Sequence, residues 1–570
     1  RMAMYNDVYG WQNKQFLGRG EFTLDFGDYD VRITAPADHI VAATGELQNS
    51  MEVLTNTQIN RLKQAKSSDE PVIIITQDEA KKNEKSKSKK VKTWRYKAKN
   101  VRDFAFTSSR KFIWDAMGIK LGNRTVMAMS YYPKEANPLF ERFSTKAVAH
   151  TLRIYSKYTF DYPYPVAISV EAANGMEYPM ICFNYGRPEK DGTYTERTKY
   201  GMISVIIHEV GHNYFPMIVN SDERQWTWMD EGLNSYLQFL TEQEWDREYP
   251  SRRGPPKNIV NYMKGNKNNL SPIMANSESI YQFGNNAYGK PTTALNILRE
   301  TIVGRELFDF AFKEYSKTWM FKHPTPSDFF RLLENATAVD LDWFWRGWFY
   351  GTDPVDISID KVTWFTLDSK NPEIEFPLKK RKKEEEPFQT WQKRNEIDIQ
   401  ETVVETDELA NDFYNKFDPY EVTILDKEDF IKYRDSSVVE PREKEIYNAN
   451  LNYYEIKFSN VGGLVMPIIL QFYYKDSTDY IIKIPAEIWK MNRNQITKIF
   501  ATKKQVASFA LDPKLETADV ELDNNHWPRK MIQSKFELYK SKKYNRHKIY
   551  KENKMQRKIR ADKKLEEKKN

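Results

Sequence analysis

Cysteine is nearly absent from this chain, which has Cys182 alone among its 570 residues. A single thiol excludes an internal disulfide and any zinc or iron–sulfur site built from several cysteines. Glycine and proline are also few, at 22 and 26, which excludes collagen-like and Pro/Gly-rich low-complexity chains. The longest apolar run, residues 461–470, has only ten residues, whereas a membrane-spanning helix needs ~20. We therefore expect no transmembrane segment.

The net positive charge is confined to the C-terminal tail. Residues 529–570 hold 17 Lys/Arg and 5 Asp/Glu, a net charge of +12, which leaves −5 for residues 1–528 within the total of +7. A mildly acidic body does not favour a nucleic-acid-binding core. Two interpretations of the tail stay open: contact with an anionic surface such as lipid, cell-wall polymer or RNA, and a solvated charged extension, which we favour.

Length and hydrophobic periodicity predict several folded units. Aromatic residues make up 14% of the chain, which is typical of packed cores rather than disorder. At roughly 150 residues per domain, the length suggests three or four units. Alternating apolar and polar residues predict strands at both ends, and helical periodicity dominates the middle. The expected domains are an N-terminal β domain lacking its start (1–130), an α-rich domain with a small sheet (131–350), a C-terminal β domain with a charged linker near 371–410 (351–528), and a basic tail (529–570).

Individual elements follow from the same patterns. Residues 166–170 (VAISV) are expected to form a buried strand, and the Lys-rich stretch 78–92 a solvated hairpin or insertion. Helical periodicity predicts helices at 202–214, 228–247, 291–301, 305–319 and 326–338.

Two of the seven histidines stand four residues apart, His208 and His212, with Glu209 between them in the pattern H-E-x-x-H. The preceding residues 202–207 (MISVII) are apolar, so the segment is expected to be a buried helix. Residues i and i+4 project from one helix face, so both imidazoles can direct a nitrogen at one metal ion. Glu209 is suited to act as general base on metal-activated water. Chance would produce on the order of 0.01 copies of this pattern here, so two hydrogen-bonded structural histidines are the minor alternative.

A third ligand is needed for a catalytic zinc site, which keeps its fourth position open. Eighteen residues separate His212 from Glu231, which lies in the sequence WMDEG ahead of a helical pattern. A loop between two helices can bring this carboxylate to the metal. From spacing alone, Glu231 is equally well explained as a favourable charge near a helix N-terminus.

The motif, its spacing and the W-x-[ND]-E-G context resemble the gluzincin metallopeptidases of the aminopeptidase N and leukotriene A hydrolase family. The resemblance implies Glu231 as the third zinc ligand. A second family signature, G-x-M-E-N, has its counterpart in residues 174–178 (NGMEY). Here Gly175, Met176 and Glu177 are the implied substrate-binding residues, with Glu177 corresponding to the glutamate that pairs with the substrate's α-amine. The first and last positions of the signature differ.

A tyrosine that stabilises the developing oxyanion is the third family element, in a Y-x-K-[GP] context about eighty residues past the first zinc histidine. Tyr288, eighty residues after His208 and followed by Gly-Lys-Pro, matches it. Tyr281 is the alternative.

The resemblance implies an α+β multidomain fold, with a thermolysin-like zinc peptidase core flanked by N-terminal and C-terminal β-sheet domains. It implies one Zn²⁺ per chain and hydrolysis of the N-terminal residue from peptides that have a free N-terminus. Phrases such as residues 323–326 (HPTP) resemble the Bacteroidota-type branch, and we expect a periplasmic or cell-envelope location, with the cytoplasm as the alternative. Two other functions stay open: a zinc endopeptidase of the same fold and a catalytically silent peptide-binding protein.

Overall fold

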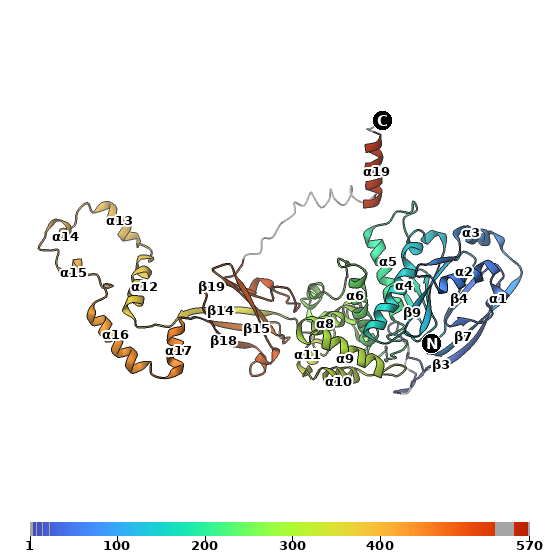
Figure 1. Cartoon of the computed structure of the whole chain (residues 1–570), viewed down its shortest axis with the longest axis horizontal. Helices are drawn as coiled ribbons and strands as arrows, with labels where there is room; N and C mark the ends of the chain where they lie inside the picture. Colours follow the sequence, from blue (N-terminus) through green and yellow to red (C-terminus); the bar gives the residue numbers. More distant parts are fainter. Residues whose placement is uncertain (1–3, 7, 14, 22, 531–551, 568–570) are drawn as a thin grey trace.

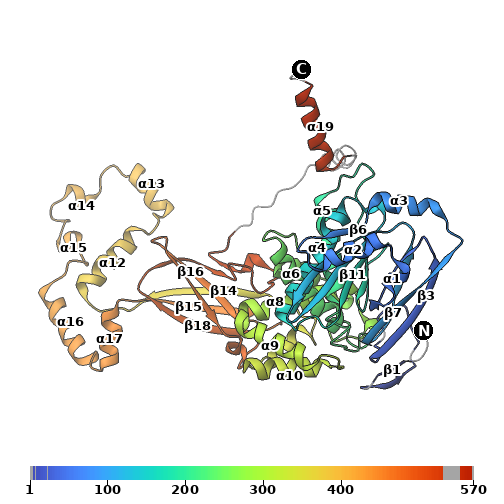
Figure 2. The ribbon, with the colours of Figure 1, turned by 45° about the vertical axis from the view of Figure 1, so that its right-hand side comes forward.

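The computed structural model describes residues 4–6, 8–13, 15–21, 23–530 and 552–567. Four regions follow one another along the long axis in Figure 1: N-terminal sheets, a mixed α/β core, C-terminal sheets and a helical arm. The core lies between the two β-rich regions in both views (Figures 1 and 2).

The N-terminal region contains a three-stranded sheet in the order β3-β7-β5 and the two-stranded pairs β4-β8 and β1-β2. Alternation explains its longest strand, because Trp94, Tyr96 and Ala98 point to the buried face while intervening side chains are more exposed. The strands are β1 (Met4–Asn6), β2 (Gly10–Gln12), β3 (Gly27–Pro36), β4 (Ile40–Ala43), β5 (Glu46–Leu47), β7 (Val91–Val101) and β8 (Phe106–Ser109).

Three helices interrupt these strands: α1 (Ser50–Val53), α2 (Asn56–Lys66) and α3 (Gln77–Ser86). The solvated hairpin expected for residues 78–92 was wrong, because most of that stretch forms α3 and the start of β7. A capping box, in which Thr76 and Glu79 satisfy each other's backbone N–H groups, starts α3.

A six-stranded sheet in the order β12-β13-β11-β10-β9-β6 is the central sheet of the core. Strands β10, β11 and β13 run parallel, and β12 closes one edge antiparallel to β13. Strands β6 and β9 precede residue 130, so the predicted domain boundary falls inside β10 and the sheet takes strands from both sides of it. The strands are β6 (Val72–Ile75), β9 (Ile113–Leu121), β10 (Arg124–Tyr132), β11 (Val166–Glu171), β12 (Met176–Tyr178) and β13 (Ile181–Asn184).

Helices cover this sheet and fill the rest of the core. The long helix α4 packs against the sheet and against α5 and α6, and most of its apolar side chains are buried. The predicted helical segments are confirmed, although π-helical turns form part of two of them. The main helices are α4 (Leu139–Tyr158), α5 (Glu196–Gly211), α6 (Leu233–Trp245), α7 (Val260–Met263), α8 (Lys290–Ile297), α9 (Arg305–Thr318), α10 (Pro326–Thr337) and α11 (Asp342–Trp348), and the π-helical turns are η2 (Trp228–Gly232), η6 (Gly284–Gly289) and η7 (Leu298–Ile302).

The C-terminal region packs a three-stranded sheet, β14-β15-β18, against a four-stranded sheet, β17-β16-β19-β20. Aromatic rings join the two sheets: Tyr454 meets Phe509 at 5.4 Å and Phe500 meets Phe472 at 5.3 Å between centroids. The strands are β14 (Ile357–Thr366), β15 (Asn452–Asn460), β16 (Ile468–Tyr474), β17 (Asp479–Ile484), β18 (Gln495–Thr502), β19 (Val506–Leu511) and β20 (His526–Trp527).

A helical arm, residues 371–450, leaves the sheet between β14 and β15 and extends away from the core (Figures 1 and 2). The linker predicted near 371–410 lies within this longer helical excursion, where capping boxes such as that of Thr423 and Asp426 start the short helices. Its helices are α12 (Pro372–Glu384), α13 (Thr390–Asp398), α14 (Val403–Thr406), α15 (Phe413–Lys416), α16 (Ile424–Ser437) and α17 (Pro441–Ala449).

Part of the basic tail forms helix α19 (Lys554–Glu566). Its first turn lies beside the start of α5, where Asn553 donates to Thr193 Oγ1 at 3.0 Å and Gln556 donates to Asp191 at 2.8 Å. Within the described residues, no helix combines the length and the apolar character that crossing a bilayer requires.

A buried carboxyl in the central sheet makes stability depend on pH. Asp115 accepts hydrogen bonds from Tyr132 Oη at 2.6 Å and from Thr145 Oγ1. Burial raises the pKa of Asp115 from 3.8 to about 7, although both hydrogen bonds oppose this. Because the folded-state pKa is raised, the stabilisation is complete below the unfolded pKa and is lost as the pH rises through 7. We expect a few kcal/mol of unfolding free energy to disappear between pH 4 and pH 8.

The substitution Asp115→Asn should flatten this pH dependence, because asparagine keeps an acceptor oxygen but cannot ionise. Urea unfolding of both proteins at pH 5 and pH 8 measures the difference. Identical losses of stability in the two proteins would contradict the assignment.

Candidate active site

Helix α5 carries both histidines of the motif on one buried face. Thr195 caps its N-terminus by accepting from Thr198 N, and the apolar residues that follow are packed in the core. The helix ends at Gly211 and His212 is its C-cap. The two imidazoles therefore face each other one turn apart, with their Nε2 atoms 3.0 Å from each other.

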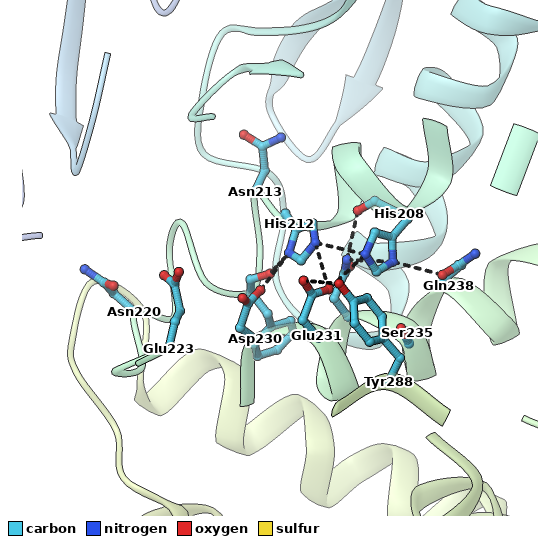
Figure 3. A network of polar contacts seen from close by, with 12 residues as sticks. His208, His212, Asn213, Asn220, Glu223, Asp230, Glu231, Ser235, Gln238 and Tyr288 are labelled. Atoms are coloured by element: carbon cyan, nitrogen blue, oxygen red, sulfur yellow. Dashed lines mark hydrogen bonds and ion pairs between the residues drawn. The ribbon is translucent and has the colours of Figure 1, made fainter. Parts of the chain in front are cut away.

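Glu231 reaches the same point from the π-helical turn η2, just before α6. Its Oε2 lies 3.0 Å from His208 Nε2 and 3.4 Å from His212 Nε2. Figure 3 shows these three side chains converging. π-Helical turns are frequent at functional sites because they re-aim side chains within a helix. The structure thus brings Glu231 to the two histidines, although Glu231 follows them by nineteen or more positions in the sequence.

These three residues fit a zinc ion by chemistry and by spacing. Two neutral imidazoles and a carboxylate are a donor set of catalytic zinc sites. Ligands about 2.0–2.1 Å from a tetrahedral ion lie roughly 3.3 Å from one another, and the donor atoms here are 3.0 to 3.4 Å apart. Burial lowers the pKa of His208 to about 4, so its ring is neutral and can donate a lone pair at neutral pH.

Outer hydrogen bonds hold each histidine ring in place. The Nδ1 of His208 is 2.9 Å from Gln238 Oε1, and Asn234 donates to the backbone oxygen of His208 at 2.9 Å. The Nδ1 of His212 is 2.9 Å from both Phe215 O and Asp230 Oδ1. Such contacts fix the tautomer that leaves Nε2 available to a metal. Sequence reasoning missed these outer residues, although Asn234 and Gln238 follow Glu231 at helical spacing.

Gly211 allows the two helices of the site to approach closely. A Cβ atom at this position would lie 2.3 Å from both Asn234 Oδ1 and Tyr155 Oη. Tyr155 Oη in turn donates to Asn234 Oδ1 at 2.8 Å. A glycine inside a helix costs about 1 kcal/mol relative to alanine. It is required here because the residues that orient His208 leave no room for a Cβ atom.

Glu209 points into the space beside Gly175. A Cβ on that glycine would lie 2.3 Å from Glu209 Oε1, so the glycine leaves room for the carboxylate. Among the described residues, Glu209 Oε2 is buried without a hydrogen-bond partner. Burial raises the pKa of Glu209 well above 4.5; His212 opposes the shift, and Glu177 and Glu231 add to it. The chain thus holds a buried carboxyl group, with an increased affinity for a proton, next to His208, His212 and Glu231.

Tyr288 lies on the π-helical turn η6 and faces the same cluster (Figure 3). Its hydroxyl donates to Glu231 Oε1 at 2.5 Å, and its ring stacks on His208 at 5.7 Å between centroids. Burial, with the charge of Glu231, raises the pKa of Tyr288 well above 10, so the hydroxyl keeps its proton. Tyr281, the alternative, has 58% of its surface exposed.

Glu177 lies on the edge strand β12, on the other side of His212. One oxygen each of Glu177 and Asp230 and one nitrogen of His212 all lie within 4.8 Å of one another. Burial raises the pKa of Glu177, His212 opposes this, and the carboxylates of Glu231 and Glu21 raise it further. Glu21, from the N-terminal segment, was not singled out from the sequence. Met176 is partly buried beside Glu177, and Tyr178 ends the strand.

A cavity of about 740 Å³ adjoins the cluster, and Glu177 is not among the residues that line it. Its inner wall includes His208, Glu209 and Tyr288, and Gly175 lies at its edge. The remaining wall comes from the exposed face of α5, from α6 and from the loop after α6. Such a concave space beside a metal-ligand cluster is the usual position of a substrate.

Residues 143–348 match the family model described as the peptidase family M1 domain. The matched stretch, 206 of the 570 residues, resembles an M1 domain. This stretch includes every site residue predicted from the sequence, from Gly175 to Tyr288.

Curated proteins that resemble part of this chain are aminopeptidases of distant organisms. Glutamyl aminopeptidase of Sus scrofa is 28% identical over 144 residues, which are 24% of this chain and 15% of that protein. Leucyl aminopeptidase of Saccharolobus solfataricus is 25% identical over 224 residues, which are 36% of this chain and 28% of that protein. The chain thus spans less than a third of the length of these curated relatives.

A solved structure extends the likeness beyond the M1 domain. Aminopeptidase A of Legionella pneumophila, in complex with aspartic acid, superposes with a TM-score of 0.51 at 11% identity, over 91% of this chain and 47% of that one. At this identity the likeness concerns the fold. The predicted α+β organisation, with β-sheet regions on both sides of a peptidase core, is confirmed.

Proposed function

We propose that this chain is a zinc-dependent aminopeptidase that hydrolyses the N-terminal residue from peptides. One observation carries the proposal: His208, His212 and Glu231 converge with donor spacings that suit zinc, and Glu209 and Tyr288 adjoin them. A histidine pair alone has structural explanations, whereas this arrangement also supplies a base and a hydroxyl donor. The family of the M1 domain and the aminopeptidase names of its relatives support the same function.

His208, His212 and Glu231 would hold one Zn²⁺ per chain. Bound zinc would polarise a water molecule and a substrate carbonyl and lower the pKa of that water toward ~7. The outer contacts from Gln238 and Asp230 keep the two rings aimed at the ion.

Glu209 would act as the proton carrier. It accepts a proton from the attacking water and passes it to the leaving amine, a role suited to a carboxyl group whose pKa burial has raised above its ordinary value. The lack of a partner for Glu209 Oε2 in the described part of the chain leaves that oxygen available for the water.

Tyr288 would donate a hydrogen bond to the carbonyl oxygen as negative charge develops there. Its hydroxyl already lies next to the ligand cluster through Glu231. A prepositioned donor in a buried site stabilises a developing oxyanion strongly, because little reorganisation is needed.

Glu177 would bind the substrate's α-ammonium group and so limit cleavage to the first peptide bond. Its buried carboxylate lies close to His212 and Asp230 and is not part of the cavity wall. A cation here would also neutralise the negative potential to which Glu21, Glu231 and Glu177 contribute.

The substitution Glu177→Gln tests both the function and this role. We expect kcat/KM for alanine p-nitroanilide to fall roughly 10- to 100-fold, because a charge-assisted contact to the amine is lost. N-Acetylalanine p-nitroanilide, which lacks the ammonium, is the control and should be a poor substrate for both proteins. Kinetics with the zinc-loaded chain, together with metal analysis, provide the measurement.

Efficient cleavage of N-acetylated peptides by the unaltered chain would indicate an endopeptidase instead. Absence of hydrolysis of all these substrates by the zinc-loaded chain would favour a silent peptide-binding protein. The Bacteroidota-type resemblance, the cell-envelope location and the anionic-surface contact of the tail stay predictions.

A further inference from the structure

Three arginines line the cavity beside the ligand cluster: Arg197 and Arg252 at its exposed rim, and the partly buried Arg253 farther in. Among the described residues, none of the three forms an ion pair with a carboxylate. Buried arginines elsewhere in this protein do: Arg299 binds Asp309 through two hydrogen bonds of 2.7 and 2.8 Å, and Arg102 binds Glu223. Arg253 therefore differs from these two arginines, because no carboxylate of the described residues pairs with it.

Arg253 is held in place without an ion pair to any described residue, although the charges of Glu231 and Glu242 act on it from a distance. Its guanidinium lies 4.2 Å from the centre of the Tyr288 ring, and its Nη1 donates weakly to Ser235 Oγ at 3.3 Å. Burial lowers the pKa of Arg253, but a guanidinium remains charged at neutral pH. Most of its five N–H donors are thus left for another acceptor.

The carboxylates of the same cavity are engaged elsewhere. Glu242 is buried and accepts from Ser204 at 2.7 Å, Gln238 at 2.8 Å and Ser251 at 2.5 Å. Glu196 is at the rim, 3.8 Å from Lys554 of α19. Glu209 adjoins the ligand cluster at the inner end. No carboxylate of the described cavity wall therefore forms an ion pair with Arg253.

The position of Arg253 fixes which part of a substrate it meets. Glu177, the proposed amine site, groups with His212 and Asp230 and is outside the cavity wall. Arg253 contacts the ring of Tyr288, whose hydroxyl in turn donates to Glu231 of the ligand cluster. Since an extended peptide advances about 3.3–3.6 Å per residue, Arg253 lies near the first or second residue after the scissile bond.

We propose that Arg253, with Arg252 and Arg197 at the rim, binds a carboxylate on the leaving-group side of the scissile bond. This inference rests on the proposed aminopeptidase function and names its substrate class. The carboxylate is either the C-terminus of a dipeptide or tripeptide or the side chain of an Asp or Glu that follows the cleaved residue. The planar guanidinium suits both, because it can bind the two oxygens of one carboxylate side by side.

Equilibrium binding to the zinc-loaded Glu209→Gln chain tests the inference without turnover. Two ligand pairs differ only in the carboxylate: Ala-Ala against Ala-Ala amide, and Ala-Glu amide against Ala-Gln amide. Calorimetry should give roughly 10- to 100-fold tighter binding of the acid in at least one pair. The pair that shows this difference identifies whether the bound carboxylate is a C-terminus or an acidic side chain. The added substitution Arg253→Met, which keeps apolar contact with Tyr288, should bring the ratio close to one.

Two further variants control for charge and folding. Arg346→Met removes an equal charge from an exposed position on α11 and should leave the ratio unchanged. Arg253→Lys keeps the positive charge but not the paired N–H donors of the guanidinium, and should retain part of the preference for the acid. Equal affinities within both pairs for the chain that contains Arg253 would overturn the inference, as would an unchanged ratio in Arg253→Met.

Hydrolysis of the same ligand pairs by the unaltered chain distinguishes a failure of this inference from a failure of the proposed aminopeptidase function. Hydrolysis of acid and amide with equal kcat/KM would contradict the role of Arg253 and leave the aminopeptidase proposal intact. Tighter binding of the acids with no hydrolysis of any peptide would support the carboxylate site and refute the aminopeptidase.

Discussion

Replacing Glu209 with Gln should lower kcat by about 10²- to 10⁴-fold, the usual contribution of a general acid–base group, while the protein keeps its zinc. Glutamine has nearly the same shape but accepts no proton. It leaves His208, His212 and Glu231 in place, because in the described structure Glu209 makes no hydrogen bond or ion pair with their donor atoms and faces Gly175 instead. Steady-state kinetics on alanine p-nitroanilide and zinc analysis of the same preparation measure both quantities.

A matched substitution, Glu334→Gln, provides the control for Glu209→Gln. Glu334 lies on α10, and its Oε1 accepts from Trp345 Nε1 at 3.2 Å and from Leu341 N at 3.0 Å. Glutamine can keep both contacts through its carbonyl oxygen, so activity should be unchanged. Retained turnover in zinc-loaded Glu209→Gln would remove Glu209 from the mechanism.

The substitution Tyr288→Phe should lower kcat by roughly 10²- to 10³-fold, as is typical when one oxyanion donor is removed. KM should change little, because the hydroxyl interacts with charge that develops only in the transition state. Phenylalanine keeps the stacking on His208 and the contact with Arg253, so losses from repacking should be small. Separate kcat and KM values, measured with zinc-saturated protein, test this expectation.

Tyr281→Phe distinguishes the two tyrosines considered from the sequence. Tyr281 is 58% exposed, and its backbone N–H donates to Ser271 Oγ at 2.9 Å, so loss of its hydroxyl should have little effect. A large loss in Tyr281→Phe with normal turnover in Tyr288→Phe would reverse the assignment.

Local patterns predicted the helices well and the sheets less completely. Apolar spacing is a property of each segment, so α9 and α10 could be recognised from their own residues. The capping box of Thr76 and Glu79 that starts α3 was also visible in the sequence, but the lysines of that stretch obscured it. Strand partners are set by contacts between distant segments, which is why β6 and β9 could not be assigned to the same sheet as β13.

The site residues also fall into two groups, those predicted from local patterns and those whose roles depend on contacts between distant segments. His208 and His212 share one helix, so their convergence followed from helical geometry alone. Glu231 and Tyr288 lie on separate π-helical turns, and only the family resemblance connected them to the histidines. Asp230, Gln238 and Arg253 were not predicted, because each acquires its role from a neighbour on another element.

By itself, the amino-acid sequence predicted the histidine pair proposed to bind zinc, the adjacent proposed base and the order of β-rich and helical regions, because these depend on spacings within single elements. Only the tertiary structure decided that Glu231 meets both rings, that Glu209 lies buried beside a glycine and that Arg253 faces a cavity without a carboxylate partner among the described residues. These features depend on distances between elements far apart in the chain, and packing of the whole core sets those distances.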